Sequence, residues 1–281
     1  LANKKGWNME ETLSRLKDMY DGYHFSESLQ GVYNPFSVLC ALNELRLKSF
    51  WIASGATEML PKILTKFERD VEKLDGSLID IDYIETSDVN TTNPKLFLYQ
   101  SGYLTIKNVI EDSYVLGFPN REVKKALFEL VLPIMLKKDK DETENAIQEL
   151  KMNFSTGNVK DGILCLKQLI AHTPYSTQKK ERFVFEEHFR FILKNLFYIC
   201  GFNVKEEEQV ANGRIDLVVE TSNIIYVIEL KMSDNGGMSA ATQQIITRHY
   251  KDAYCASHKS VVGLALVFDK DNRGLKDWNE V

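Results

Sequence analysis

The chain of 281 residues has an ordinary globular composition, 44% hydrophobic and 27% charged, which supplies one large or two modest cores. Its formal net charge of −5 argues against binding nucleic acid through the overall field of the protein, although local basic patches remain compatible with it. The four cysteines are scattered without a CxxC pair, which indicates reduced thiols. No apolar run approaches the ~18 to 20 residues of a membrane helix, and no signal peptide is recognisable, so we expect a cytoplasmic protein with no membrane partner.

Apolar residues at helical spacing predict a mainly helical N-terminal region. Met9, Leu13 and Leu16 recur at steps of three and four, and Pro35 suits the first turn of a later helix. From Leu96 the chain becomes β-prone around a central Ser-Gly, which predicts a short strand or hairpin. We expect helices over residues 8–20, 35–48, 51–74 with a break near Ser54 to Pro61, 121–136 and 142–172, with NFSTGN as a loop candidate inside the last of these.

The C-terminal part follows a different order, and the loop-like HTPYST of residues 172–177 places the main boundary near residue 173. The run VVGLALVF, residues 261–268, is typical of a strand covered on both faces. We predict an α/β (α+β overall) protein whose last domain has an α-β-β-β-α-β order and a mixed central sheet with helices on both sides. Its elements are a helix over 181–200, strands over 202–210, 213–220 and 224–231, a helix over 239–257 and a strand over 260–268.

Three charged residues interrupt the β-prone hairpin of residues 213–232. A turn centred near Ser222 sets Asp216 opposite residue 228 or 229, which makes Asp216 and Glu229 cross-strand neighbours; directly opposed residues have Cβ atoms about 4.5 to 5.5 Å apart. Lys231, two residues after Glu229, points to the same face. A divalent cation such as Mg²⁺ offsets the repulsion of two such carboxylates, and the ammonium of Lys231 can orient a water or neutralise charge on phosphorus oxygens. The three residues thus fit a site for phosphodiester hydrolysis.

An exposed hairpin face explains the same three charges without any chemistry. On such a face Asp216, Glu229 and Lys231 form surface ion pairs worth roughly 0 to 1 kcal/mol. Triplets of the form ExK also arise often by chance in a chain that is 27% charged. The hairpin pattern alone leaves both interpretations open.

Two neighbouring helices carry polar residues that extend the site hypothesis. Glu186 shares a helical face with Phe189 and Leu193 and therefore looks inward, where a metal site could partner it; a capping or buried hydrogen-bonding role is the alternative. Gln244 could hold the lysine, a water or a phosphate, or be a surface glutamine. Residues 206–209, EEEQ, are expected to be a solvated strand edge rather than a second metal site, because consecutive strand residues point to alternating faces.

Asp216 followed by Glu229-Leu230-Lys231, with a helical glutamate before them and a helical glutamine after them, resembles the PD-(D/E)XK nuclease superfamily. GRIDLVVETSNIIYVIELKM and ATQQI are similar to its subgroup described as DUF1703 or PDDEXK-9. The resemblance implies a restriction-endonuclease-like domain and Mg²⁺ or Mn²⁺ as the cofactor. It implies these roles: Asp216 and Glu229 as metal ligands, Leu230 as a ligand through its carbonyl, Lys231 as the catalytic lysine, Glu186 as the accessory acid and Gln244 as the accessory amide.

The match departs from the superfamily pattern at one position and is open at another. Ile215 stands where the superfamily nominally has a proline before the aspartate, a variation that the superfamily tolerates. Glu187 lies beside Glu186, which leaves the helix acid open by one position.

The resemblance extends upstream through LKDMYDGYHF, GVYNPFSVLCAL, LYQSGYLTIK and FPNREVKKAL. It implies three parts: residues 1–78 as the helical C-terminal part of an AAA-ATPase-like domain, 79–172 as a connector with a short hairpin and helices, and 173–281 as the nuclease-like domain. No GxxxxGK[ST] occurs, so we expect no ATP binding by this chain. Because the chain starts at Leu1 rather than Met, we expect a fragment or a short form.

The sequence therefore predicts a Mg²⁺-dependent nuclease that hydrolyses phosphodiesters of nucleic acid, with DNA as the expected substrate, and leaves homo-oligomerisation open. The alternative is a catalytically inactive nuclease-fold module that binds nucleic acid or protein and is attached to an ATPase. The intact acid, acid and lysine set favours the enzyme, because a degenerate copy usually loses one member. The cations expected to contact the phosphate backbone are Lys179, Lys180, Arg182, Arg190, Lys194, Arg248 and Lys251.

Overall fold

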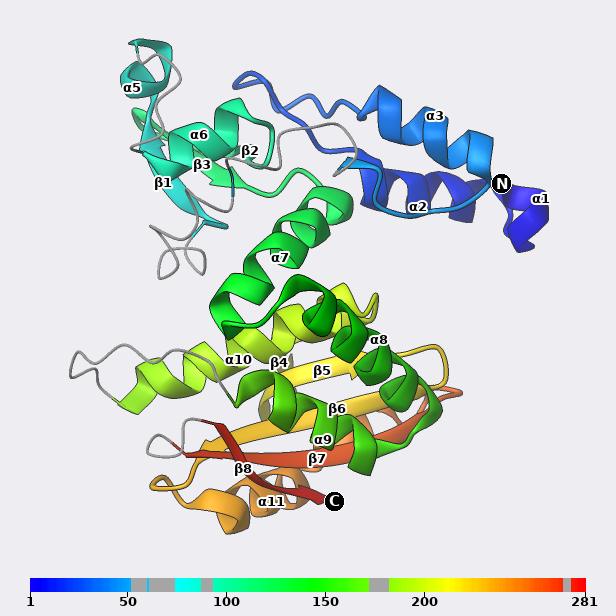
Figure 1. Cartoon of the computed structure of the whole chain (residues 1–281), viewed down its shortest axis with the longest axis vertical. Coiled ribbons are helices and arrows are strands. Elements are labelled where there is room, and N and C mark those ends of the chain that lie inside the picture. The colour runs from blue at the N-terminus through cyan, green and yellow to red at the C-terminus, as the bar shows by residue number, and fades with distance from the viewer. Residues whose placement is uncertain (52–59, 61–73, 87–92, 172–181, 270–273) are drawn as a thin grey trace. The chain divides into compact units, whose positions relative to one another are not determined.

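The computed structural model describes residues 1–51, 60, 74–86, 93–171, 182–269 and 274–281 of the chain (Figure 1). Contacts divide it into two compact units, Leu1–Ile134 and Met135–Val281, and each is described by itself. Within the described ranges, no helical segment combines the length and the apolar character that crossing a bilayer requires.

The first unit combines helices with a small antiparallel sheet of order β1-β3-β2. Asn8 and Asn34 begin two of its helices, because each side chain accepts hydrogen bonds from backbone N–H groups of the first turn. The strands are β1 (Ser77–Asp80), β2 (Thr105–Ile110) and β3 (Ser113–Gly117). The helices are α1 (Ala2–Lys5), α2 (Met9–Tyr20), α3 (Pro35–Glu44), α5 (Ile81–Thr86), α6 (Pro94–Gln100) and α7 (Arg121–Leu136).

The helical character predicted for this unit is confirmed, with local corrections. The helix expected over 35–48 ends at Glu44, because Leu45 takes a left-handed φ of 55° and closes the last turn. Most of the helix expected over 51–74 lies outside the described residues. The helices expected over 8–20 and 121–136 are α2 and α7.

The hairpin expected after Leu96 is confirmed as β2 and β3, but residues 96–100 are helical. Asn93 caps helix α6 and Pro94 occupies its first turn, and these two signals outweigh the β propensity of the apolar residues that follow. Strand β1 was not predicted, because its four residues are too few to show a period of two.

The second unit is a five-stranded mixed sheet of order β4-β5-β6-β7-β8, in which β6 and β7 are parallel and the other pairs antiparallel. The strands are β4 (Asn203–Val210), β5 (Gly213–Glu220), β6 (Ile224–Met232), β7 (Ser260–Asp269) and β8 (Gly274–Glu280). The helices are α8 (Lys140–Thr156), α9 (Val159–Ile170), α10 (Arg182–Ile199), α11 (Gly237–Thr247) and the 3₁₀ turn η3 (Tyr250–Tyr254). The predicted α-β-β-β-α-β order and mixed sheet are confirmed.

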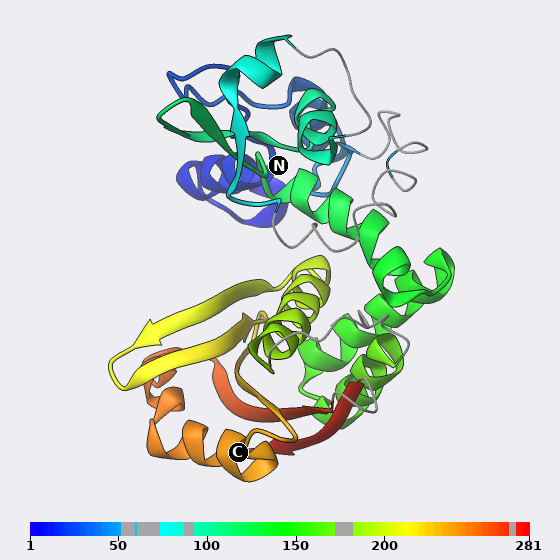
Figure 2. The same cartoon turned by 90° about the vertical axis from the view of Figure 1, so that its left-hand side faces the viewer.

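Helices cover both faces of this sheet (Figures 1 and 2). On one face Phe154 of α8 packs edge-on against Phe197 of α10 and Tyr226 of β6, with ring centroids 4.9 and 5.0 Å away. The next residue of β6, Val227, points to the other face, where it packs with Tyr250 of η3. Both faces of β6 are therefore buried, and a charged residue on this strand lies in a low-dielectric environment.

Two C-terminal elements differ from the sequence prediction. The helix expected over 239–257 divides, because His249 takes a left-handed φ of 50° and the chain continues as η3. This break turns the ring of Tyr250 into the core, where it is 2% exposed. Strand β8 was not predicted, because it is a mostly exposed edge strand with Leu275 as its buried apolar residue.

Helices α8 and α9, which the sequence analysis assigned to a connector, lie in the same compact unit as the sheet. The hydroxyl of Tyr226 donates to the carbonyl of Phe154 at 2.8 Å, which ties α8 to the central strand. The division into residues 1–78, 79–172 and 173–281 stays a prediction.

Candidate active site

The β5–β6 hairpin changes its bonding pattern where the charged residues begin. Its backbone ladder runs as far as Leu217 opposite Ile228, and the same register sets Asp216 opposite Glu229. At that point the Asp216 side chain replaces the backbone, because its Oδ2 accepts the N–H of Leu230 at 2.9 Å. The carboxylate of Asp216 is thereby fixed beside β6, while the predicted role of the Leu230 carbonyl stays a prediction.

Glu229 is fully buried and only half satisfied by hydrogen bonds. Its Oε1 accepts from Lys231 Nζ at 2.8 Å, whereas its Oε2 has no hydrogen-bond partner among the described residues. Burial, followed by the charge of Asp216, raises the pKa of Glu229 to about 8, against the opposing effect of Lys231. Burial alone would lower the pKa of Lys231, but the charge and the hydrogen bond of Glu229 outweigh it and raise that pKa.

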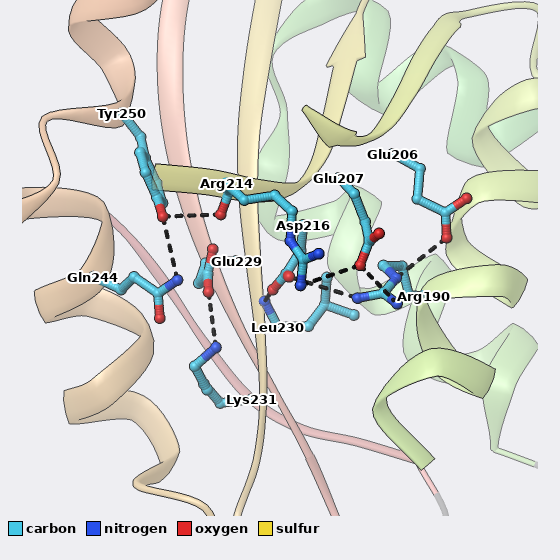
Figure 3. Close-up of polar contacts among 10 residues, drawn as sticks. All are labelled: Arg190, Glu206, Glu207, Arg214, Asp216, Glu229, Leu230, Lys231, Gln244 and Tyr250. Atoms are coloured by element: carbon cyan, nitrogen blue, oxygen red, sulfur yellow. Dashed lines mark hydrogen bonds and ion pairs between the residues drawn. The ribbon is translucent and has the colours of Figure 1, made fainter. Parts of the chain in front are cut away.

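Asp216 is paired on its other side with Arg190 of α10, as Figure 3 shows. The distance from Arg190 Nη1 to Asp216 Oδ1 is 3.7 Å, and the guanidinium also contacts Glu206 at 3.2 Å and Glu207 at 3.3 Å. Lys194 forms a further ion pair with Glu206. The expectation of a solvated edge over residues 206–209 was therefore wrong for the first two acids, which are half-buried and paired.

The helix acid is better identified as Glu186 than as Glu187. Glu186 is half-buried, and its pKa is raised by burial, lowered by Lys231 and raised again by Asp216, so it interacts with both residues. Glu187 is exposed. Both residues line the same cavity, but the electrostatic connection to the hairpin runs through Glu186.

Gln244 is held at the site by a tyrosine that the sequence analysis did not assign a role. Its Nε2 donates to the hydroxyl of Tyr250 at 3.3 Å, and that hydroxyl donates to the carbonyl of Arg214 at 2.9 Å (Figure 3). A Cβ on Gly213 would lie 2.8 Å from the same hydroxyl, so a residue without a side chain is needed there. Tyr250 thus joins α11 to the start of β5.

Replacing Tyr250 with Phe should lower the free energy of unfolding by about 1 kcal/mol, because the ring stays while both hydrogen bonds of its hydroxyl are lost. Urea unfolding followed by circular dichroism measures this difference. Tyr254→Phe, on the same 3₁₀ turn and half-buried, is the matched control. Equal losses in the two variants would show that the bridge from Gln244 to Arg214 contributes nothing of its own.

These side chains, which come from α10, the β5–β6 hairpin and α11, surround a cavity of about 570 Å³. Its lining includes Glu186, Asp216, Glu229, Lys231 and Gln244 from the predicted set, together with Arg190, Arg214 and Arg248. Arg214 and Arg248 are exposed; Arg214 pairs with Glu207 at 3.4 Å, and Arg248 donates to the carbonyl of Asn212 at 3.2 Å. Arg214 was missed because nothing in the sequence separates it from other surface cations.

The donor set fits a hard divalent cation. Two carboxylates on adjacent strands face one cavity, and Glu229 Oε2 is buried without a hydrogen-bond partner in the described structure, which leaves that oxygen able to accept a ligand. Among the described residues, no three acid, histidine or cysteine side chains are already arranged around a common metal position. Protein side chains would thus supply part of the coordination, and water and substrate the rest.

The α-β-β-β-α-β core brings Asp216, Glu229 and Lys231 into one cavity. Residues 184–278 match the family model described as "PD-(D/E)XK nuclease superfamily", which identifies a domain of this superfamily in the second unit. No solved structure matches the chain significantly.

A curated relative covers a longer stretch than this domain. The chain is 24% identical over 266 residues to "Uncharacterized protein in vnfD 5'region" of Azotobacter chroococcum mcd 1. The match covers 92% of this chain and 51% of that protein, so the chain spans about half the length of this relative.

Proposed function

We propose that the second unit is a Mg²⁺- or Mn²⁺-dependent phosphodiesterase that cleaves nucleic acid, with DNA as the substrate. The single observation that carries this proposal is Glu229, a fully buried carboxylate with an unpartnered oxygen, opposite Asp216 and bonded to Lys231. A surface ion pair, which was the alternative, has no reason to be buried at the centre of a sheet.

Asp216 and Glu229 would hold the metal ion from adjacent strands. A bound divalent ion would lower the pKa of a water and polarise a phosphoryl oxygen. Lys231 suits the stabilisation of negative charge on the phosphate, because its pKa is raised and the ammonium therefore stays protonated. Glu186, with a pKa raised by burial, is suited to accept a proton from the attacking water.

The cations that would bind the phosphate backbone differ from those expected from the sequence. Arg190 and Lys194 pair with acids inside the domain, and Lys251 bonds to the main-chain oxygen of Val281. Arg248, which was expected, and Arg214, which was not, line the cavity and are exposed. Lys179, Lys180 and the side chain of Arg182 lie outside the part of the chain that the structure describes.

The connection to an ATPase is a separate proposal. The likeness of residues 1–78 to the C-terminal part of an AAA-ATPase-like domain, and the DUF1703 subgroup, rest on the sequence motifs alone. This chain has no GxxxxGK[ST], so we propose no ATP binding by its residues.

Asp216→Ala should reduce metal-dependent cleavage by at least about 100-fold, because it removes a carboxylate that acts on the metal. Cleavage of supercoiled plasmid, single-stranded DNA and RNA with Mg²⁺ or Mn²⁺ measures the effect. Asp252→Ala is the control, since Asp252 is 69% exposed on the same domain. Undiminished cleavage by the Asp216 variant would remove the assignment. No cleavage and no Mn²⁺ binding by the unaltered chain would favour the inactive binding module.

A further inference from the structure

Three carboxylates stand in a row across strands β4, β5 and β6. The β4–β5 register sets Glu207 opposite Asp216, and the β5–β6 register, continued by one residue, sets Glu229 on the other side. Like charges opposite one another in a sheet repel, so each gap in the row needs a compensating cation. The close pair of Asp216 and Glu229 was predicted from the sequence, and the close pair of Asp216 and Glu207 was not.

The gap between Glu207 and Asp216 is occupied by a guanidinium. Arg190 reaches it from α10 with its side chain 11% exposed, and contacts Glu207 through Nη2 at 3.3 Å and Asp216 through Nη1 at 3.7 Å. Its Nε donates to Glu206 at 3.2 Å, which fixes the planar group between the two strands (Figure 3). Glu207 meets it from a left-handed backbone with φ of 51°, which interrupts the ladder opposite Asp216.

Formal charges cancel on the β4 side of the row. Three carboxylates there meet three cationic side chains: the acids are Glu206, Glu207 and Asp216, and the bases are Arg190, Lys194 and Arg214. A dication added on this side would find no surplus negative charge.

Formal charges do not cancel on the β6 side. Lys231 is the described cation that contacts Glu229, and Glu186 adds a second carboxylate nearby. With Glu186 and Glu229 both ionised, one negative charge and the unpartnered Glu229 Oε2 remain on this side. Arginine therefore compensates the acids between Glu207 and Asp216, whereas the acids between Asp216 and Glu229 lack full compensation.

We infer that this domain binds one divalent cation, between Asp216 and Glu229, and that the guanidinium of Arg190 takes the place of a second cation between Asp216 and Glu207. The inference rests on the proposed function and adds the metal stoichiometry to it. Arg190 is a positioning residue here, because it acts on the metal through Asp216. It also keeps Asp216 in place before the metal binds.

Isothermal titration of the full chain with Mn²⁺ measures the stoichiometry directly, and Mn²⁺ electron paramagnetic resonance detects coupled ions independently of activity. The unaltered chain should bind one ion per chain with an uncoupled signal. Arg190→Met, which keeps an apolar side chain and removes the charge, should bind a second ion. Arg190→Lys should keep a single ion, and Glu207→Gln added to Arg190→Met should return the stoichiometry to one.

Two ions on the unaltered chain, or one on a folded Arg190→Met variant, would overturn the inference. If Arg190→Met does not fold, Glu207→Gln alone decides in its place: one ion on both the unaltered chain and this variant is the expected result, and a loss of the ion places it at Glu207 and overturns the inference. Failure of the proposed function looks different, because the unaltered chain then binds no Mn²⁺ at all.

Discussion

Glu229→Gln is expected to stabilise the metal-free protein near pH 8 by on the order of 3 kcal/mol. The carboxyl has a pKa of about 8 in the folded chain, against the ordinary value of 4.5 that it regains on unfolding. Below pH 4.5 the Glu229 carboxyl is protonated in both the folded and the unfolded state, so it does not change the free energy of unfolding. As the pH rises from 4.5 toward 8, unfolding releases a proton, so the wild-type chain loses stability while the glutamine variant, which does not titrate, keeps it.

Urea unfolding in the presence of a chelator, at about pH 5 and about pH 8, measures this difference, which should be larger at the higher pH. Glu220→Gln is the matched control on the same hairpin. A hydrogen bond from Lys259 lowers the pKa of Glu220, so its replacement should not stabilise the protein at either pH. A Glu229→Gln variant that is less stable than the wild type at the higher pH would show that the buried carboxylate is already fully compensated.

With Mn²⁺ present, the wild-type protein should become more stable than the Glu229→Gln variant, the reverse of their order without metal. A ligand that binds the folded state stabilises it by an amount that grows with the logarithm of the ratio of its concentration to its Kd, and Glu229→Gln removes one of the two acids expected to hold the ion. The wild-type melting temperature should therefore rise with Mn²⁺ while that of the variant stays nearly constant. The destabilising burial of Glu229 is thus the property that would make it a metal ligand.

The strand order and the hairpin were predictable because both depend on local signals. Runs of β-branched residues fix β5, β6 and β7 to within a residue of the expected bounds, and the two-residue period fixes which side chains share a face. The approach of Asp216 to Glu229 follows from turn length alone. Asp216, Glu229 and Lys231 of the hairpin therefore lie together in one cavity.

The partners of these residues were not predictable from the sequence, because they depend on how separate elements pack. Arg190 was expected to contact the phosphate backbone of nucleic acid, since nothing local shows that three acids of β4 and β5 surround it. The left-handed backbone at Glu207 broke the simple alternation used for residues 206–209. The same kind of backbone at His249 divided a helix that the apolar pattern continues, and so brought Tyr250 to Gln244.

Lys231→Met should lower cleavage by about 100-fold or more, the range expected for loss of a group that acts in the transition state. The substitution has two effects that can be separated. It removes the ammonium 2.8 Å from Glu229 and so raises the pKa of that carboxyl further, which weakens metal binding near neutral pH. It also removes the positive charge that would face the phosphate.

Raising the pH to about 9 with excess Mn²⁺ should restore metal binding of Lys231→Met without restoring kcat, because deprotonating Glu229 repairs only the first effect. Lys231→Arg keeps the charge and should retain more activity than the methionine variant. Full recovery of kcat at high pH and high Mn²⁺ would mean that Lys231 acts only by holding Glu229 ionised, and its assignment as a residue that contacts the phosphate would then be withdrawn.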